Sequence, residues 1–361
     1  MKKIKLIGLL MILTSSLMFI QCTSSLDEGP QGVAGVDGTD GTDGVDGVDG
    51  TASCVACHNE SHREPIKASY ELSKHGMGAE LSSGENSGSC TQCHTSQGYI
   101  DYVTNGSITG SAYPDANQTI RCTTCHDMHS TFDFANDGQD FALRNISPVK
   151  LVIDPTTSID FGSTSNNCVT CHQPRNSYPV PAGTGTITIT SYRYGPHHGP
   201  QSTMLEGIMG ANVVGATAYP VPGSATHRTG ASCTKCHMNS TTAGEGLGKH
   251  SMNVKDEAGN YVDNCVKCHT SGVPAGVTGY AADLQTLKDL LVAKKYISSE
   301  TGYVLGANGT SNAGNTNQLV IPAKDAQAIW NYKTLIEDNS DGIHNPGYAK
   351  ALLKNSIQAL Q

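Results

Sequence analysis

CVACH at residues 54–58 is the first of six stretches of the form Cys-x-x-Cys-His, and the whole chain is arranged around this pattern. Two cysteines separated by two residues can form thioether bonds with the two vinyl groups of one haem, and the histidine that follows then lies under the iron. A single pair would also suit zinc binding or thiol redox chemistry. A histidine directly after all six pairs favours six covalently bound haem c groups.

Each motif supplies two attachment cysteines and one proximal histidine. The attachment residues are Cys54, Cys57, Cys90, Cys93, Cys122, Cys125, Cys168, Cys171, Cys233, Cys236, Cys265 and Cys268, and the proximal ligands are His58, His94, His126, His172, His237 and His269. Only Cys22 remains of the 13 cysteines. Because no pair is left for a disulfide framework, we expect haem attachment to staple the fold.

The first residues are typical of an exported protein. Three lysines precede an apolar stretch over residues 6–20, and Cys22 follows at once. This resembles a bacterial lipoprotein signal, which implies a signal peptide over residues 1–21 and lipidation of Cys22, although the residues one and three places before the cysteine depart from that pattern. A retained membrane anchor is the alternative. Either way we expect export, as an outer-membrane lipoprotein that faces the periplasm or the cell surface.

Residues 22–53 are predicted to connect this anchor to the cytochrome. Glycine recurs at every third position over residues 29–50, with aspartate in step. Gly-x-y periodicity is the collagen signature, so a short trimerising triple helix is one interpretation. The single proline and the repeated acidic residues favour a hydrated, extended tether.

The charge limits the classes of partner. A formal net charge of −9 argues against a basic nucleic-acid footprint. Haem propionates would add further negative charge, which favours encounter with basic patches on other redox proteins. Beyond the N-terminal segment no stretch approaches the ~18 apolar residues of a spanning helix, so we expect membrane contact only through the anchor.

Two regions of different composition follow the tether. Residues 54–280 are rich in Gly, Ser, Thr and Asn, and the chain has only five Phe and one Trp, a shortage that apolar haem macrocycles would offset. We expect a mainly α, haem-stapled multihaem cytochrome with much irregular loop and one short strand within residues 187–194. Residues 281–361 carry apolar residues at helical spacing, which predicts helices over residues 283–296, after Pro322 and after Pro346. A face that these helices leave uncovered would allow a homo-oligomer.

Histidines are numerous enough to supply a second axial ligand to every haem iron. Eight of the 14 lie outside the motifs, and a second protein ligand leaves electron transfer as the main task of a haem. Small neighbouring residues would let His75, His227 and His250 approach a haem closely. His129 is too near His126 to reach the far side of its own haem, but it could serve another one.

Two histidines of the eight are expected to be spare. His197 and His198 are adjacent, and we prefer His198 as the distal ligand. The charged neighbours of His62 favour a solvated residue. Methionine ligation is the remaining alternative, and it would raise the reduction potential of a haem.

The order of the motifs and histidines resembles a known family. CHDMH, PHHGPQSTML, CTKCHM, GKHSMNV, CVKCH and GIHNPGYAKALL follow one another as in multihaem cytochromes c of the pentahaem nitrite reductase and octahaem reductase group. The resemblance covers most of residues 54–361. It implies a mostly helical fold with closely stacked haems, and His129, His198, His250 and His344 as distal ligands. The ammonia-forming nitrite reductases carry a CxxCK motif, whereas every motif here ends in histidine, so nitrite reduction is not expected.

Three functions are compatible with this pattern. The preferred one is a non-catalytic electron carrier with six bis-histidine haems, which passes electrons to other redox proteins or extracellular acceptors. An oxidoreductase acting on small nitrogen or sulfur compounds would need one open haem and nearby hydrogen-bond donors. A filament with haems continuous between copies is the third, and a lipid anchor argues against it.

Overall fold

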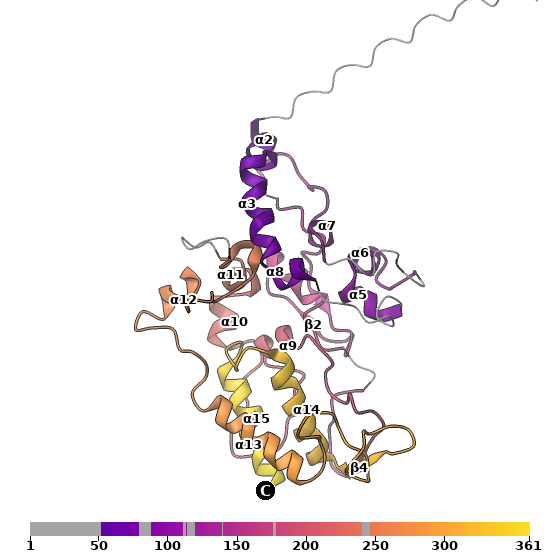
Figure 1. The fold of residues 1–361 in the computed structure, drawn as a ribbon. Coiled ribbons are helices and arrows are strands. Elements are labelled where there is room, and N and C mark those ends of the chain that lie inside the picture. The colour runs from indigo at the N-terminus through magenta and orange to yellow at the C-terminus, as the bar shows by residue number, and fades with distance from the viewer. Residues whose placement is uncertain are drawn as a thin grey trace, which may run out of the picture. The chain divides into compact units, whose positions relative to one another are not determined.

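The three helices predicted near the C-terminus form the best-packed part of this computed structural model. They are α13 (Tyr280–Ala293), α14 (Ala323–Asp338) and α15 (Pro346–Leu360), and they lie together next to the C-terminus (Figure 1). Proline marks two of the starts: Pro322 directly precedes α14, and Pro346 is the first residue of α15, where its missing N–H costs nothing. The three predicted helices are confirmed.

The structure describes residues 52–78, 88–110, 113, 120–138, 140–175, 178–239 and 246–361. The predicted signal peptide, Cys22 and the glycine-aspartate tether lie outside this part of the chain. The chain divides after residue 52, and residues 53–361 form the unit described below. No helix among the described residues has the length and apolar character needed to cross a membrane.

The main hydrophobic core lies between these helices and loops from the middle of the chain. Trp330 of α14 is fully buried, and its indole N–H donates a hydrogen bond of 3.0 Å to the carbonyl of Met209. Asn331 binds both backbone groups of Ala211, accepting at 2.7 Å and donating at 2.9 Å. The polar contacts of α14 therefore fix the loop around residues 209–211 against the helices.

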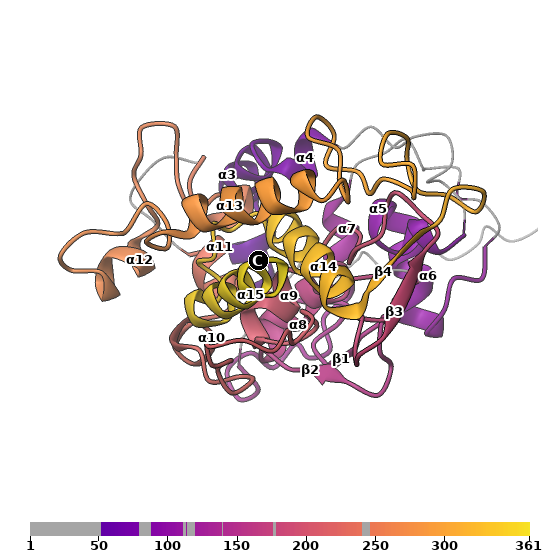
Figure 2. The same ribbon diagram turned by 90° about the horizontal axis from the view of Figure 1, so that it is seen from below.

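The described residues contain two short antiparallel pairs of strands. β3 (Thr186–Ile189) pairs with β4 (Leu319–Pro322), and β1 (Val149–Lys150) pairs with β2 (Ser158–Ile159). The strand predicted within residues 187–194 is thus present but ends at Ile189, because Ser191 begins a turn in which its carbonyl accepts from the Tyr194 N–H. Seen from below, β3 and β4 lie beside α14 (Figure 2).

The six motifs lie on short helices. Among their described residues, Val169 is the one buried apolar side chain, whereas Thr91, Gln92, Thr124 and residues 165–167 are buried polar ones, so the motif helices add little to an apolar core. The motif helices are α2 (Ala52–His58), α5 (Thr91–His94), α7 (Cys122–Cys125), α8 (Ser163–Val169), α11 (Cys233–His237) and α12 (Asp263–Cys268).

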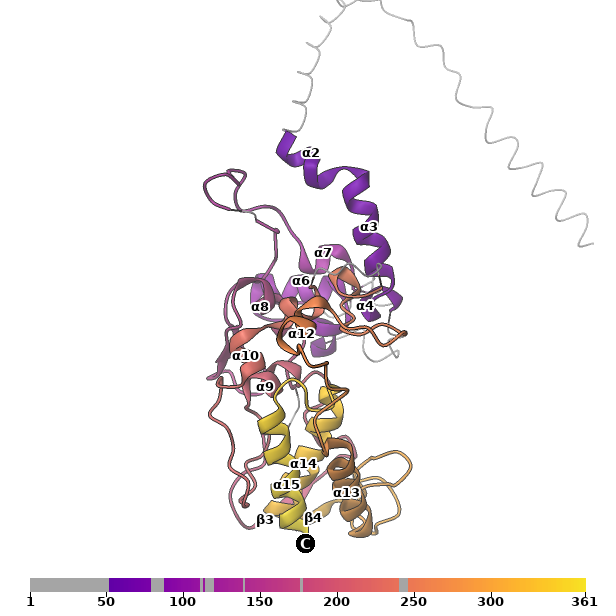
Figure 3. The ribbon, with the colours of Figure 1, turned by 90° about the vertical axis from the view of Figure 1, so that its left-hand side faces the viewer.

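The remaining helices connect the motifs. They are α3 (Glu60–Glu71), α4 (Lys74–Met77), α6 (Ser96–Asn105), α9 (Gln201–Glu206) and α10 (Thr226–Gly230), with 3₁₀ turns η1 (Gly88–Cys90) and η2 (Lys249–Ser251). Helices α7, α8 and α11 lie away from the C-terminal end of the unit (Figures 1 and 3). The observed fold is mainly helical with irregular loops and few strands, as predicted. Haem stapling stays a prediction.

Candidate haem sites

Histidine rings meet in pairs throughout the motif region. Each of five pairs joins one motif histidine to one histidine outside the motifs. The ring centres are 6.0 Å apart for His58 and His129, 5.9 Å for His172 and His75, 6.3 Å for His126 and His250, 6.2 Å for His269 and His227, and 6.4 Å for His237 and His344. We number the sites one to six in the order of the motifs, so these pairs belong to sites one, four, three, six and five.

The spacing of the rings fits one metal between them. An imidazole nitrogen lies about 2.0 Å from a bound metal ion and roughly 1 Å from its own ring centre, so two rings on opposite sides of one iron have centres about 6 Å apart. All five pairs have this separation, and each has two cysteines on the motif side. Two facing imidazoles beside two attachment cysteines are the donor set that fits a haem c with two axial histidines.

Hydrogen bonds at the ring nitrogens fix which nitrogen can bind a metal. Nδ1 of His126 lies 2.8 Å from the Phe141 carbonyl, and Nδ1 of His237 lies 2.8 Å from the Met252 carbonyl. A carbonyl can only accept, so each Nδ1 carries the proton and the lone pair of Nε2 is left for a metal. The same holds for His227, whose Nδ1 lies 2.5 Å from a carbonyl, that of Ile343.

Burial favours the neutral form of four of the paired rings, and metal ligation requires a neutral ring. Burial, and then the proximity of His172, lowers the pKa of His75 to about 4. Burial also lowers the pKa of His172, His237 and His250. His344 differs: burial alone would lower its pKa, but the Asp338 carboxylate attracts its positive charge and accepts its hydrogen bond, so the pKa is raised overall.

The second site involves the adjacent histidines 197 and 198. His197 is partly buried. Burial is the largest cause that lowers its pKa to about 4, followed by the charges of His198, Arg175 and His94. His198 is two-thirds exposed, and its Nδ1 lies 2.8 Å from the Glu337 carboxylate. The ring centres of His197 and His198 lie 4.5 Å apart, and the preference for His198 stays a prediction.

Cysteines of different motifs also lie next to one another. The thiol of Cys171 contacts that of Cys93, and the thiol of Cys168 contacts that of Cys233. Asn167 of α8 binds the Cys125 thiol. The fourth motif is therefore adjacent to the second, third and fifth motifs.

The two remaining sites adjoin this group. The side-chain amide of Asn264, in the sixth motif region, donates 2.6 Å to the carbonyl of Lys235 in the fifth motif. His129 of site one and His126 of site three share one loop. The described motifs consequently form one connected cluster with the fourth at a branch point.

Some of the exposed apolar side chains lie in or next to the motifs. Val55 and Val266 lie inside the first and sixth motifs and are 53% and 52% exposed, while Met128 and Phe132 follow the third motif and are 83% and 74% exposed. Apolar macrocycles held by the neighbouring cysteines would cover them, which agrees with the shortage of aromatic residues.

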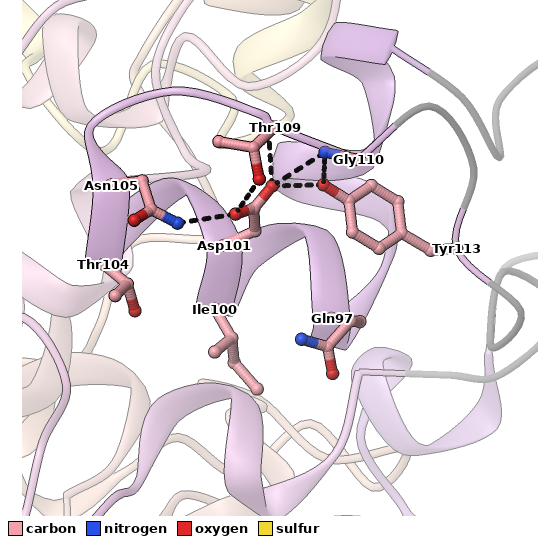
Figure 4. Close-up of a pocket in the computed structure, with 8 residues that line it drawn as sticks. All are labelled: Gln97, Ile100, Asp101, Thr104, Asn105, Thr109, Gly110 and Tyr113. Atoms are coloured by element: carbon pink, nitrogen blue, oxygen red, sulfur yellow. Dashed lines mark hydrogen bonds between the residues drawn. The ribbon is translucent and has the colours of Figure 1, made fainter.

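A pocket on α6 contains none of the motif residues. It has a volume of about 360 Å³ and is lined by Asp101, Tyr113 and neighbours (Figure 4). The Asp101 carboxylate accepts hydrogen bonds from Asn105, from the backbone and hydroxyl of Thr109, and from the Tyr113 hydroxyl. Both of its oxygens accept hydrogen bonds from the protein itself, so Asp101 fixes the segment that follows α6 against that helix.

Several contacts of the sites were not predicted from the sequence. Gln201 holds Nδ1 of His172 at 3.2 Å, Asp338 holds His344, and Arg175 hydrogen-bonds to Cys93. The sulfur of Met252 lies 3.1 Å from Nδ1 of His75. His62 is exposed on α3, as predicted.

Comparison with known proteins supports a cytochrome. The chain is 24% identical over 340 residues to the C-type polyheme cytochrome OmcC of Geobacter sulfurreducens, and 23% identical over 338 residues to the C-type polyheme cytochrome OmcB of two strains of that organism. The matches cover 75% of this chain but only 42% and 43% of those proteins, so it spans less than half the length of these relatives. No family model and no solved structure matches. The chain is a distant relative of multihaem c-type cytochromes.

Proposed function

We propose that this protein is an electron-transfer cytochrome that holds six covalent haem c groups, each between two histidines. The observation that carries the proposal is the set of five ring pairs, in which a motif histidine always meets a histidine from outside the motifs. The distant similarity to polyheme cytochromes supports the same function.

Haem c supplies a reversible one-electron iron couple. The protein's own residues would set the properties of that couple. The two cysteines of each motif would attach one macrocycle to the backbone, and the carbonyls of Phe141 and Met252 hold the rings of His126 and His237 in one orientation. Two protein ligands leave no coordination position for a substrate, which suits transfer of electrons without bond making or breaking.

At the second site we assign the distal position to His197 in place of His198. This assignment is supported by the partial burial of His197 and by the effect of the His94 charge on its pKa, whereas His198 is two-thirds exposed. The other distal ligands are His129, His250, His75, His344 and His227, for sites one, three, four, five and six.

The clustering of the motifs supports a relay. Thiol contacts join the fourth motif to the second and fifth motifs, and a hydrogen bond joins the fifth motif to the sixth motif region. Site four, which adjoins three motifs, would be the junction. Such an arrangement gives the protein three outer sites, numbers one, two and six, at which partners could exchange electrons.

We further propose that the protein is exported and anchored by lipidation of Cys22, at the outer membrane, with residues 22–53 as a tether. Its partners would be other redox proteins or extracellular acceptors. The acidic chain favours partners with basic surfaces.

Electron paramagnetic resonance of the oxidised holoprotein tests the proposed function. We expect only low-spin ferric signals, which integrate to six haems per chain. A sizeable high-spin signal that disappears on addition of cyanide would instead indicate an open haem.

One observation favours an oxidoreductase as the second candidate. Arg175 and Tyr102 both lie near Cys93, so the second site gathers a cation and a phenol that could bind a small anion. This function would require His197 to leave the iron. A nitrite- or sulfite-dependent change in the spectrum that is lost in R175A would support it.

A further inference from the structure

The ten paired histidines differ in what their Nδ1 atoms contact. Four of them donate to neutral oxygens at 2.5–3.2 Å, namely the carbonyls of Phe141, Met252 and Ile343 and the side chain of Gln201. His344 is different, because its Nδ1 lies 2.7 Å from a carboxylate oxygen of Asp338. His129 lies 4.0 Å from Asp140, beyond hydrogen-bond distance. Among the paired rings in the described residues, His344 is the one hydrogen-bonded to a carboxylate.

Asp338 is held rigidly and away from water. Its side chain has no exposed surface, and its second oxygen accepts a hydrogen bond from the Ser340 hydroxyl. It is the last residue of α14, a helix of 16 residues packed against α15, so the negative end of that helix adds to the carboxylate charge. A charge in such surroundings acts strongly on its neighbour, because little solvent screens it.

We propose that Asp338 is a positioning residue which makes His344 an electron-rich axial ligand and so lowers the reduction potential of the haem at site five. The inference rests on the proposed function. A carboxylate that accepts the proton of a ligating imidazole orients the ring and raises its basicity. A more basic ligand favours the ferric over the ferrous state, and hydrogen bonding of this kind is one of the ways in which a protein sets haem potential.

The test is a potentiometric titration of the holoprotein, followed by absorbance and electron paramagnetic resonance. In D338N, one of the six couples is expected to rise by at least about 59 mV, which corresponds to a tenfold change in a one-electron equilibrium. Asp341 provides the matched control, because it is an exposed carboxylate in the same turn, and D341N should leave all six couples in place. D338E, which keeps the charge, should return the shifted couple toward its original potential.

S340A tests the same inference by a change of potential in the opposite direction. It removes the hydroxyl that competes for the Asp338 carboxylate, so the potential of the same couple should fall. The inference is overturned if D338N keeps six low-spin haems and no couple moves, or, should D338N not retain its haems, if S340A leaves every couple unchanged. Failure of the proposed function would look different, since the unaltered protein would then lack six low-spin haems.

Discussion

Replacing His197 and replacing His198 should have opposite effects on the ligation of the second haem. In H197A the second haem loses its distal ligand and becomes five-coordinate. We expect His198 to remain at its exposed position, where its Nδ1 lies 2.8 Å from the Glu337 carboxylate. In H198A the pair of His94 and His197 is untouched, so all six irons keep two ligands.

The size of the effect follows from the number of motifs. One haem in six should become high-spin in H197A, and the reduced protein should bind one carbon monoxide per chain, because only an open iron takes a small molecule. H198A should bind none. The assay is a titration of the dithionite-reduced protein with carbon monoxide, read from the Soret band, with haem content measured on the same samples.

The contrary result is easy to recognise. If H198A binds one equivalent of carbon monoxide and H197A binds none, then the distal ligand is His198, and the proximity of His197 to His94 has no role in ligation. One equivalent in the unaltered protein would show that the second site is open.

Three further predictions concern the rest of the described chain. Leu352 of α15 is fully buried, so L352A should lower the free energy of unfolding by about 2–5 kcal/mol, whereas V320A, at a side chain 57% exposed, should change it by less than about 0.5 kcal/mol, as measured by chemical denaturation. Hydrogen bonds from Tyr113 and then Thr109 hold the pKa of Asp101 well below its usual range, so the carboxylate stabilises the fold fully above about pH 4 and loses this effect as the pH falls further. The difference in melting temperature between the unaltered protein and D101N should therefore shrink in acid. A difference that stays constant would contradict this role of Asp101. Haem-free protein should be cut by proteases within the motif region while α13, α14 and α15 stay protected, and uniform resistance would show that this region folds without haem.

The C-terminal helices could be predicted because their signals are local. Apolar residues at helical spacing and two prolines fix their position to within a few residues, as the offset between predicted residues 283–296 and observed α13 (Tyr280–Ala293) illustrates. The helix α3 (Glu60–Glu71) was missed. It has no apolar stripe and contains Pro65, so its position depends on the Asn59 cap and on contacts with η2.

The choice between His197 and His198 could not be made from sequence. Neighbouring residues share the same flanking sequence, whereas the positive φ of 62° at His197 and the contact of His198 with Glu337, which is distant in sequence, appear only in the fold. The link between Asp338 and His344 is also hidden, because an acidic residue at the end of a helix usually faces solvent. The motif residues themselves were predictable, since haem attachment requires their spacing.

Iron-edge anomalous diffraction from crystals of the holoprotein tests the central claim most directly. We predict six iron peaks per chain, five of them midway between the histidine pairs of sites one, three, four, five and six, and the sixth between His94 and His197. Iron absent from the motifs, or a metal bound among cysteine sulfurs instead of between imidazole rings, would contradict the account.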